Sequence, residues 1–233
     1  MVREALEAGA AIETIFATES MLQDAGLMEL ARAAGVEIQP VGDAVIGALS
    51  ETTTPQGIAA VAASTLEALG SLPPKPDLVL VLHEVRDPGN AGTLIRSAVA
   101  AEADAVIFTG TSVDPLGPKT VRASAGALFR TRVITADFDE TLRSLRGGGA
   151  TVVGARVGAE DPPDACDFSR PIALVVGNEG WGLPPEVAEA MDVTVGIPMP
   201  GPAESLNVAV AGSILLYEVV RQRRAGRATQ LPG

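Results

Sequence analysis

The chain has 233 residues, of which 47% are hydrophobic, with a formal net charge of −12, one cysteine and one histidine. This composition supports a sizeable core, and it excludes gross disorder, an internal disulfide and a His/Cys metal cluster. No apolar run approaches the ~20 residues that cross a bilayer, and the start lacks the apolar stretch of a signal peptide. Together with the single cysteine, these features lead us to expect a cytoplasmic protein without membrane contact. The net charge excludes a broadly basic surface.

The first part of the chain alternates short helical and strand patterns. A helix is predicted to end near residue 8, with Gly9 after it, and a second helix is predicted to be capped by Ser20. The predicted strands are 12–17, 36–40 and 58–63; the helix capped by Ser20 spans 21–34, and a third helix is predicted over 41–49. Together they indicate a small α/β domain over residues 1–64. Residues 1–70 hold two arginines and ten acidic residues, a net charge of −8.

Residues 65–76 separate two stretches of different composition. They contain Pro73, Pro74 and Pro76, which stiffen an extended backbone. We interpret this segment as an interdomain linker. A surface loop within one domain is the alternative.

Beyond the linker, residues 77–233 alternate fully apolar strands with helices. The predicted strands are 78–82, 105–108, 133–134, 151–155, 172–176 and 193–197, and the predicted helices are 90–101, 120–127, 138–145, 184–190 and 206–223. This alternation is typical of a parallel sheet that is covered on both faces. Between Arg86 and Arg132 the chain holds six basic and four acidic residues, so a locally positive face is expected.

The first segment that bears on chemistry spans residues 87–96 and follows the predicted strand 78–82. Pro88 and Gly89 favour a turn, Asn90 is a good N-cap, and Arg96 lies about two helical turns further on. The glycine spacing does not match a dinucleotide-binding fingerprint. The alternative interpretation is a capped helix that carries a solvated Arg96.

The second segment, residues 174–183, places Gly177, Gly180 and Gly182 directly after a buried strand. Ligands of open α/β sheets bind beyond the carboxyl ends of strands, and glycines let a ligand approach the backbone closely. We therefore predict a ligand-binding loop. A tight turn in which Trp181 serves only for packing is the alternative.

The third segment, residues 197–207, leads from a strand through a Pro-Gly loop into an apolar helix that we expect to be capped near Ser205. Backbone amides at such a helix start can hold a polar ligand. A rigid loop with an N-cap is the alternative. We interpret His83 as structural, because the nucleophile-elbow pattern that would pair Ser205 with a histidine is absent.

The three segments resemble the signature motifs of the SpoU/TrmH family of RNA 2′-O-methyltransferases, which belong to the SPOUT superfamily. The match is N-x-G-x-x-x-R at 90–96, L-V-x-G-N-E-G-x-G-L at 174–183 and I-P-M-x-G-x-x-x-S-L-N at 197–207. Residues 119–127 are also similar to a family helix, and the resemblance covers residues 78–223.

This resemblance implies an α/β fold with two parts. The C-terminal part would be a SPOUT domain with a parallel sheet and a deep trefoil knot, which binds S-adenosyl-L-methionine (SAM) and forms a homodimer. The N-terminal part would be a small RNA-recognition domain similar to ribosomal-protein-like substrate-binding domains. Residues 2–9 match the end of that domain's first helix, and the strand that usually precedes it is missing, so we expect the domain to lack its first strand.

The resemblance also assigns residues, without any metal. The positions that match the family's catalytic residues are Asn90, Arg96, Glu179, Ser205 and Asn207. The implied SAM pocket comprises Val176, Gly177, Asn178, Glu179, Gly180, Ile197, Met199, Ser205 and Leu206. Arg96 and Arg122 are the candidate RNA contacts.

The implied reaction is methyl transfer to the ribose 2′-hydroxyl of structured RNA, with ribosomal RNA favoured over tRNA. A guanidinium holds its proton strongly, so we expect Arg96 to bind a phosphate and orient the hydroxyl rather than to act as a base. Two alternatives remain: a module that docks on RNA or protein without catalysis, and a methyltransferase that modifies a base nitrogen.

Overall fold

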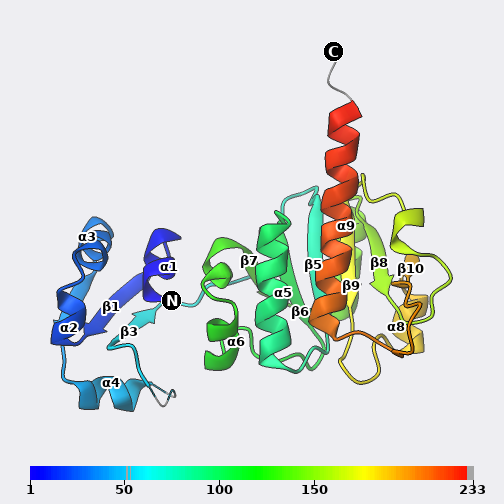
Figure 1. Ribbon diagram of the computed structural model, residues 1–233. Coiled ribbons are helices and arrows are strands. Elements are labelled where there is room, and N and C mark those ends of the chain that lie inside the picture. The colour runs from blue at the N-terminus through cyan, green and yellow to red at the C-terminus, as the bar shows by residue number, and fades with distance from the viewer. Residues whose placement is uncertain (51, 53, 230–233) are drawn as a thin grey trace. The chain divides into compact units, whose positions relative to one another are not determined.

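A computed structural model describes residues 1–50, 52 and 54–229 of the chain (Figure 1). Two compact units can be distinguished. The smaller unit comprises Met1–Thr65 and Ala125–Arg130, and the larger one comprises Leu66–Ser124 and the chain from Thr131 onward. Residues 230–233, which the predicted catalytic domain includes, lie outside the described residues.

The smaller unit is an α/β structure around a three-stranded sheet with the order β2-β1-β3. Strand β1 pairs with β2 in parallel and with β3 in the antiparallel sense. Its elements are α1 (Val2–Glu7), β1 (Ile12–Ala17), α2 (Glu19–Leu22), α3 (Ala25–Ala33), β2 (Glu37–Pro40), α4 (Asp43–Leu49) and β3 (Ile58–Ala62). Its core consists of Leu6, Ile15, Ala17, Leu27 and Ala31. The predicted strands are therefore confirmed to within a residue or two.

The helix predicted over 21–34 is wrong in one respect, because the chain forms two helices there. Asp24 lies between them in an extended conformation, and its Oδ1 accepts a hydrogen bond of 3.0 Å from the Leu27 N–H. An N-cap carboxylate satisfies one of the free amides at a helix start. Helix α3 therefore begins after Asp24, and Ser20, the predicted cap, lies within α2.

The larger unit contains a seven-stranded, fully parallel sheet with the order β10-β8-β9-β5-β6-β7-β4. Its strands are β4 (Leu66–Glu67), β5 (Leu78–His83), β6 (Ala105–Thr109), β7 (Arg132–Thr135), β8 (Thr151–Ala155), β9 (Ile172–Val176) and β10 (Val193–Val195). Its helices are α5 (Pro88–Ala100), α6 (Pro118–Ala123), α7 (Phe138–Gly147), α8 (Pro185–Glu189) and α9 (Val208–Thr229). The predicted parallel sheet is confirmed.

Both faces of this sheet are buried, which explains why its strands are continuously apolar. In β5, Val79 and Val81 pack into a core cluster with Leu142 and Leu145 of α7. Because side chains alternate along a strand, the other residues of β5 face the opposite side, and they are buried as well. That second face is covered by α5 and α9, which lie side by side in Figure 1.

The helices on this second face approach one another closely at two glycines. A Cβ on Gly92 of α5 would lie 2.4 Å from the Ala123 Cβ of α6, and a Cβ on Gly212 of α9 would lie 2.5 Å from Leu94 Cδ2. Only a residue without a side chain allows backbones to pack at this distance. These contacts fix α5 between α6 and α9.

Two predicted N-caps of the larger unit are wrong. Helix α5 begins at Pro88, and Asp87 caps it by accepting a 2.8 Å hydrogen bond from the Asn90 N–H. A proline suits the first helical position because it has no N–H to leave unpaired. Helix α9 begins at Val208, and Asn207 rather than Ser205 supplies its cap. Both shifts release a side chain of the motif segments, Asn90 and Ser205, from the capping role.

Helix α6 is shorter than predicted, because the backbone is left-handed at Ala125 (φ 48°) and Gly126 (φ 90°). A right-handed helix cannot continue through such residues. In the segment expected as a linker, residues 65–76, Leu66–Glu67 form strand β4 beside β7, and Leu69–Ser71 form a 3-10 turn. The domain boundaries and the trefoil knot stay predictions.

Candidate active site

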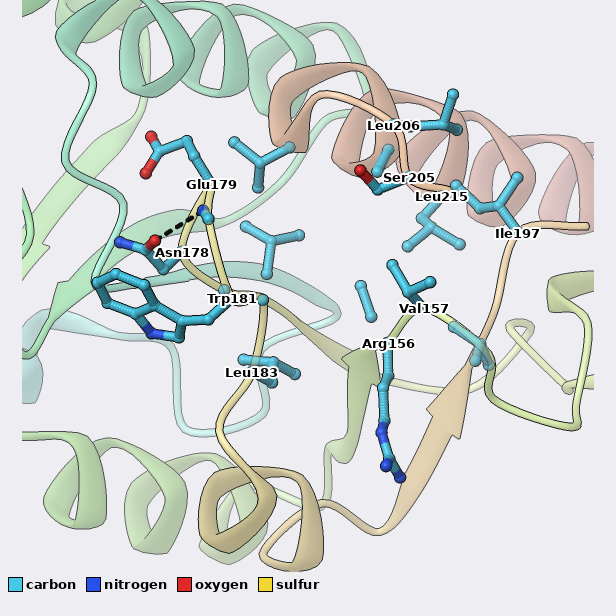
Figure 2. A pocket seen from close by; sticks show the side chains of 18 of the residues that line it. Arg156, Val157, Asn178, Glu179, Trp181, Leu183, Ile197, Ser205, Leu206 and Leu215 are labelled. Atoms are coloured by element: carbon cyan, nitrogen blue, oxygen red, sulfur yellow. Dashed lines mark hydrogen bonds between the residues drawn. The ribbon is translucent and has the colours of Figure 1, made fainter. Parts of the chain in front are cut away.

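A cavity of about 430 Å³ lies at the carboxyl ends of strands β8, β9 and β10 (Figure 2). Its walls are the loops that follow these strands and the start of α9. All nine residues predicted to bind SAM line it: Val176, Gly177, Asn178, Glu179, Gly180, Ile197, Met199, Ser205 and Leu206. Segments two and three, separated in the sequence, therefore form one cavity.

The loop after β9 is held rigidly by its own backbone. Asn178 and Gly182 exchange two backbone hydrogen bonds of 3.0 and 2.9 Å, which close a tight turn. A Cβ on Gly177 would lie 2.3 Å from the carbonyl carbon and oxygen of Gly182. Gly182 itself has a φ of +69°, which favours glycine. Gly177 is therefore required by a contact within the turn, and the close approach of a ligand to these glycines stays a prediction.

The buried side chain of Asn178 anchors this loop to the end of β5. Its Nδ2 donates to the Glu84 carbonyl at 2.8 Å, and its Oδ1 accepts from the Gly180 N–H at 2.8 Å (Figure 2). Glu84 has a left-handed backbone with a φ of 57°, which is uncommon for a residue other than glycine. The strained residue thus directs its carbonyl at the amide that holds the loop.

A chain of hydrogen bonds joins one polar residue from each motif segment. Asn207 Nδ2 donates to Asn90 Oδ1 at 2.9 Å, and Asn90 Nδ2 donates to Glu179 Oε1 at 3.1 Å. Asn207 Oδ1 accepts from the N–H groups of Ala209 and Val210 at the start of α9. Each amide therefore has one orientation only, because its oxygen and nitrogen face different partners. We call Asn90, Glu179 and Asn207 the polar cluster.

Glu179 accepts hydrogen bonds from three residues, Arg86, Asp87 and Asn90. Its Oε1 accepts from the Asp87 N–H at 3.0 Å in addition to Asn90, and its Oε2 accepts from the Arg86 N–H at 3.2 Å. Partial burial of the carboxyl acts to raise its pKa, but the hydrogen bonds from Asp87, Asn90 and Arg86 outweigh it and lower the pKa of Glu179 below its usual value. The group is a carboxylate at neutral pH and a weak proton acceptor.

The cavity suits the nucleoside-containing cofactor that the family resemblance implies. Its volume lies within the ~300–1,000 Å³ of small-molecule pockets. The apolar side chains of Leu183, Ile197 and Leu215 can cover a planar base, while the exposed loop backbone and Ser205 offer polar groups. The tight turn at Gly177 provides a wall without side chains. The lining residues therefore fit SAM.

The two predicted RNA contacts lie elsewhere in the chain. Arg96 is exposed on α5 and does not line the cavity, and its side chain takes part in none of the hydrogen bonds or ion pairs between described residues. Arg122 is exposed on α6 and also lies outside the cavity lining. His83 is buried, where its Nδ1 lies 3.0 Å from Thr109 Oγ1 and its ring packs against Phe138. This supports its structural interpretation.

One wall of the cavity was not predicted from the sequence. It consists of Ala155, Arg156 and Val157 at the carboxyl end of β8. The signal existed, since a strand was predicted at 151–155, and ligands lie beyond carboxyl strand ends. What was lacking is the strand order that places β8 next to β9. Trp181, which was not among the residues predicted to bind SAM, also lines the cavity.

The part of the chain that the structure describes lacks two further features. No group of three or more His, Cys, Asp or Glu side chains there is arranged to hold a metal ion. No helix in that part has the length and apolar character needed to cross a membrane.

Both units match models of known protein families. A model of the SpoU rRNA Methylase family matches residues 77–217, and a model named RNA 2′-O ribose methyltransferase substrate binding matches residues 1–66. Together these matches cover nearly the whole chain.

Similar curated proteins are ribosomal RNA methyltransferases. The chain is 36% identical over 185 residues to the 23S rRNA (guanosine(2553)-2′-O)-methyltransferase RlmP of Bacillus subtilis (strain 168), covering 79% of this chain and 73% of that protein. It is 38% identical over 202 residues to the 23S rRNA (guanosine-2′-O-)-methyltransferase RlmB of Ralstonia nicotianae, covering 84% and 81%.

Similar solved structures include two with bound AdoMet, which is SAM. The SpoU methyltransferase AviRb from Streptomyces viridochromogenes in complex with AdoMet superimposes with a TM-score of 0.86 at 31% identity, covering 96% of this chain and 89% of that one. An AdoMet-bound rRNA methyltransferase from Sinorhizobium meliloti gives 0.83 at 31% identity, covering 99% and 85%.

Proposed function

Because the chain belongs to the SpoU rRNA Methylase family, we propose that it methylates a ribose 2′-hydroxyl of structured ribosomal RNA at the cavity beside Glu179. It is an RNA 2′-O-methyltransferase that uses SAM, as its rRNA-methylating relatives and the AdoMet-bound structures support. The observation that carries the proposed site is that segments two and three form one cavity and that the polar cluster joins Asn90 of the first segment to both of them. A cytoplasmic location suits this substrate.

We assign the cofactor to the nine lining residues already named, with the end of the cavity near Ile197 and Leu215 for its base (Figure 2). When bound, SAM supplies a methyl group on a sulfonium, which an oxygen nucleophile can take. The protein's part is to exclude water from the cavity and to orient the ribose hydroxyl. Ser205, whose side chain lines the cavity, is the residue we assign to a direct polar contact there.

The polar cluster acts by positioning. Glu179 is ionised, and its hydrogen bonds to Arg86, Asp87 and Asn90 hold the loop after β9 against the start of α5. Its lowered pKa makes it a poor general base. Asn90 and Asn207 extend the same link to the start of α9. The cluster thus fixes the position of helix α5, to which we assign RNA binding, relative to the cavity that would hold SAM.

Arg96 and Arg122 would hold RNA phosphates, and Arg96 has to reach a cavity other than the one formed by its own chain. We propose a homodimer that brings it there. Helix α9 exposes an apolar stripe that suits such an interface. The stripe consists of Val210 (48% exposed), Ile214 (40%) and Tyr217 (67%) on α9, spaced three or four residues apart, and Leu206 (36%) lies just before the helix. Residues at this spacing share one helix face.

The activity is tested with unmodified 16S, 23S and transfer RNA transcripts and methyl-labelled SAM. Digestion to nucleosides and mass spectrometry should reveal a 2′-O-methylnucleoside from ribosomal RNA. A base-methylated nucleoside would contradict the ribose assignment. RNA binding without methyl incorporation, in protein that binds SAM, would favour a docking module.

The dimer is tested by mixing two inactive variants, Arg96→Ala and Gly177→Val. A mixed dimer then has one cavity with both groups intact if Arg96 acts on the partner's cavity, so random mixing should restore about a quarter of the activity. No recovery would mean that Arg96 acts within its own chain. Glu179→Gln replaces Gly177→Val if the latter does not fold.

A further inference from the structure

Trp181, the single tryptophan of the chain, is unusually exposed for its size. It lies at the tip of the loop after β9, lines the cavity, and has 56% of its surface exposed. Exposing a large aromatic ring to water is unfavourable, and a tryptophan is mostly buried in folded proteins. Nothing in the polar cluster or the cofactor assignment uses this ring.

The ring is held in place from two sides. The tight turn closed by Asn178 and Gly182 fixes the backbone that carries it. Arg86 stacks on it, with the guanidinium carbon 5.2 Å from the ring centroid, a cation–π contact. A stacked ring on a closed turn is preorganised, so little entropy is lost when a further planar group stacks on it.

Arg86 is itself fixed by its neighbours. Its Nη2 donates to Thr111 Oγ1 at 2.8 Å and lies 3.9 Å from Glu84 Oε2, while its backbone N–H donates to Glu179. Its side chain is nevertheless 53% exposed. The guanidinium can therefore stack on Trp181 with its face and still present N–H groups to an anion.

The ring lies at the end of the cavity that Glu179 of the polar cluster lines. Figure 2 shows Trp181 beside Asn178 and Glu179, whereas Ile197 and Leu206 lie at the opposite end. An exposed aromatic face next to an exposed guanidinium is complementary to an unpaired nucleotide, whose base stacks and whose phosphate pairs with arginine.

We propose that Trp181, backed by Arg86, is the platform on which an unpaired base of the RNA substrate stacks, at or next to the methylated nucleotide. This inference rests on the proposed function. It gives the site a preference for unpaired over base-paired RNA, because a base within a duplex is already stacked on its neighbours. Arg86 contributes a contact to the adjoining phosphate.

The single tryptophan makes the proposal directly measurable, because all tryptophan fluorescence of the chain comes from Trp181. The titrants are a single-stranded RNA nonamer, the same strand annealed to its complement, and S-adenosylhomocysteine, with Trp181→Phe as the blank. The single strand should quench the emission at concentrations at which the duplex does so several-fold less. Quenching by S-adenosylhomocysteine alone, with none by RNA, would overturn the proposal and assign the ring to the cofactor. RNA binding in a filter assay without quenching would also overturn it.

Activity provides a second readout. Trp181→Ala should raise the KM for RNA about tenfold, Trp181→Phe should retain most of the activity, and the SAM affinity measured by calorimetry should be unchanged in both. Arg86→Gln should raise the KM for RNA less, while Arg170→Gln, an exposed arginine before β9, is the matched control. An equal loss of SAM affinity in Trp181→Ala would contradict the proposal. If the wild type does not methylate RNA either, the proposed function fails. The fluorescence titration then still decides whether the ring contacts RNA.

Discussion

The cavity wall after β9 and the polar cluster at its edge come from overlapping segments but are stabilised differently. The wall depends on backbone geometry, with Gly177 packed against the Gly182 carbonyl and two backbone hydrogen bonds closing the turn. The polar cluster depends on side-chain hydrogen bonds between Asn90, Glu179 and Asn207. A backbone contact of this kind tolerates no added atom, whereas side-chain hydrogen bonds, of about 1 kcal/mol between neutral groups and about 1.5–3 kcal/mol to a charged group, can be weakened singly.

This difference separates two functions of one site. Changes to the wall should act on SAM binding, because its turn shapes the cavity and has no room for an added atom at Gly177. Changes to the polar cluster should act mainly on the rate of methyl transfer, because the cluster links the cavity to the helix that carries Arg96. The following predictions test that separation, from the largest effect to the smallest.

Gly177→Val should give the largest effect. Its Cβ would lie 2.3 Å from the Gly182 carbonyl, so the turn must open, at a cost of about 1–3 kcal/mol or more. SAM affinity in calorimetry should fall about 100-fold, equivalent to ~2.8 kcal/mol. Gly147→Ala in α7, whose added Cβ meets no atom within 4 Å, is the matched control and should bind SAM normally. Normal binding by Gly177→Val would show that the turn is not part of the SAM site.

Glu179→Gln should reduce kcat about 10- to 100-fold, because hydrogen bonds to a charged group contribute about 1.5–3 kcal/mol. The variant keeps the shape of the side chain but loses the charge that the Asp87 and Arg86 amides and Asn90 stabilise. SAM affinity should fall far less than in Gly177→Val. Glu102→Gln, two residues beyond the end of α5, is the control. A loss confined to SAM affinity would contradict the separation of the two regions.

Asn207→Asp should reduce kcat about tenfold, or ~1.4 kcal/mol, with stability changed by less than about 0.5 kcal/mol. The carboxylate still accepts from Ala209 and Val210 and keeps α9 capped, but it can no longer donate to Asn90. Asn207→Ala removes the cap as well and should cost about 1 kcal/mol of unfolding free energy in denaturant titrations. Equal activities for the two variants and the wild type would show that the link to Asn90 is dispensable.

The smallest effect concerns pH. Since the folded-state pKa of Glu179 is lowered, its carboxylate stabilises the fold above its usual pKa of 4.5, and this stability is lost as pH falls through the lower folded-state value. The unfolding free energy of the wild type should therefore exceed that of Glu179→Gln by a constant amount at neutral pH and by less below pH 4.5. The difference between the two proteins also cancels the contribution of His83, whose pKa burial lowers in both. A difference independent of pH would contradict the sign derived for Glu179.

Local patterns in the sequence were sufficient for most elements of the fold. The continuous apolar runs predicted buried parallel strands, because a strand covered on both faces has no polar side, and β9 was predicted residue for residue. Helix starts were less accurate. By residue type, α5 could be capped by Asp87 or Asn90, and α9 by Ser205 or Asn207. The choice depends on which side chains the neighbouring loops require.

For the site, the sequence by itself determined that glycine-rich and proline-rich segments follow strands, and its resemblance to a family pointed to the nine residues that line one cavity. Only the tertiary structure decided that Asn207, Asn90 and Glu179 form one hydrogen-bonded chain, that β8 supplies a wall, that Trp181 is exposed against Arg86, and that Arg96 lies outside the cavity of its own chain. The physical reason is range: helix and strand patterns depend on residues a few positions apart, whereas these contacts join residues about 90 to 117 positions apart, which only the strand order brings together.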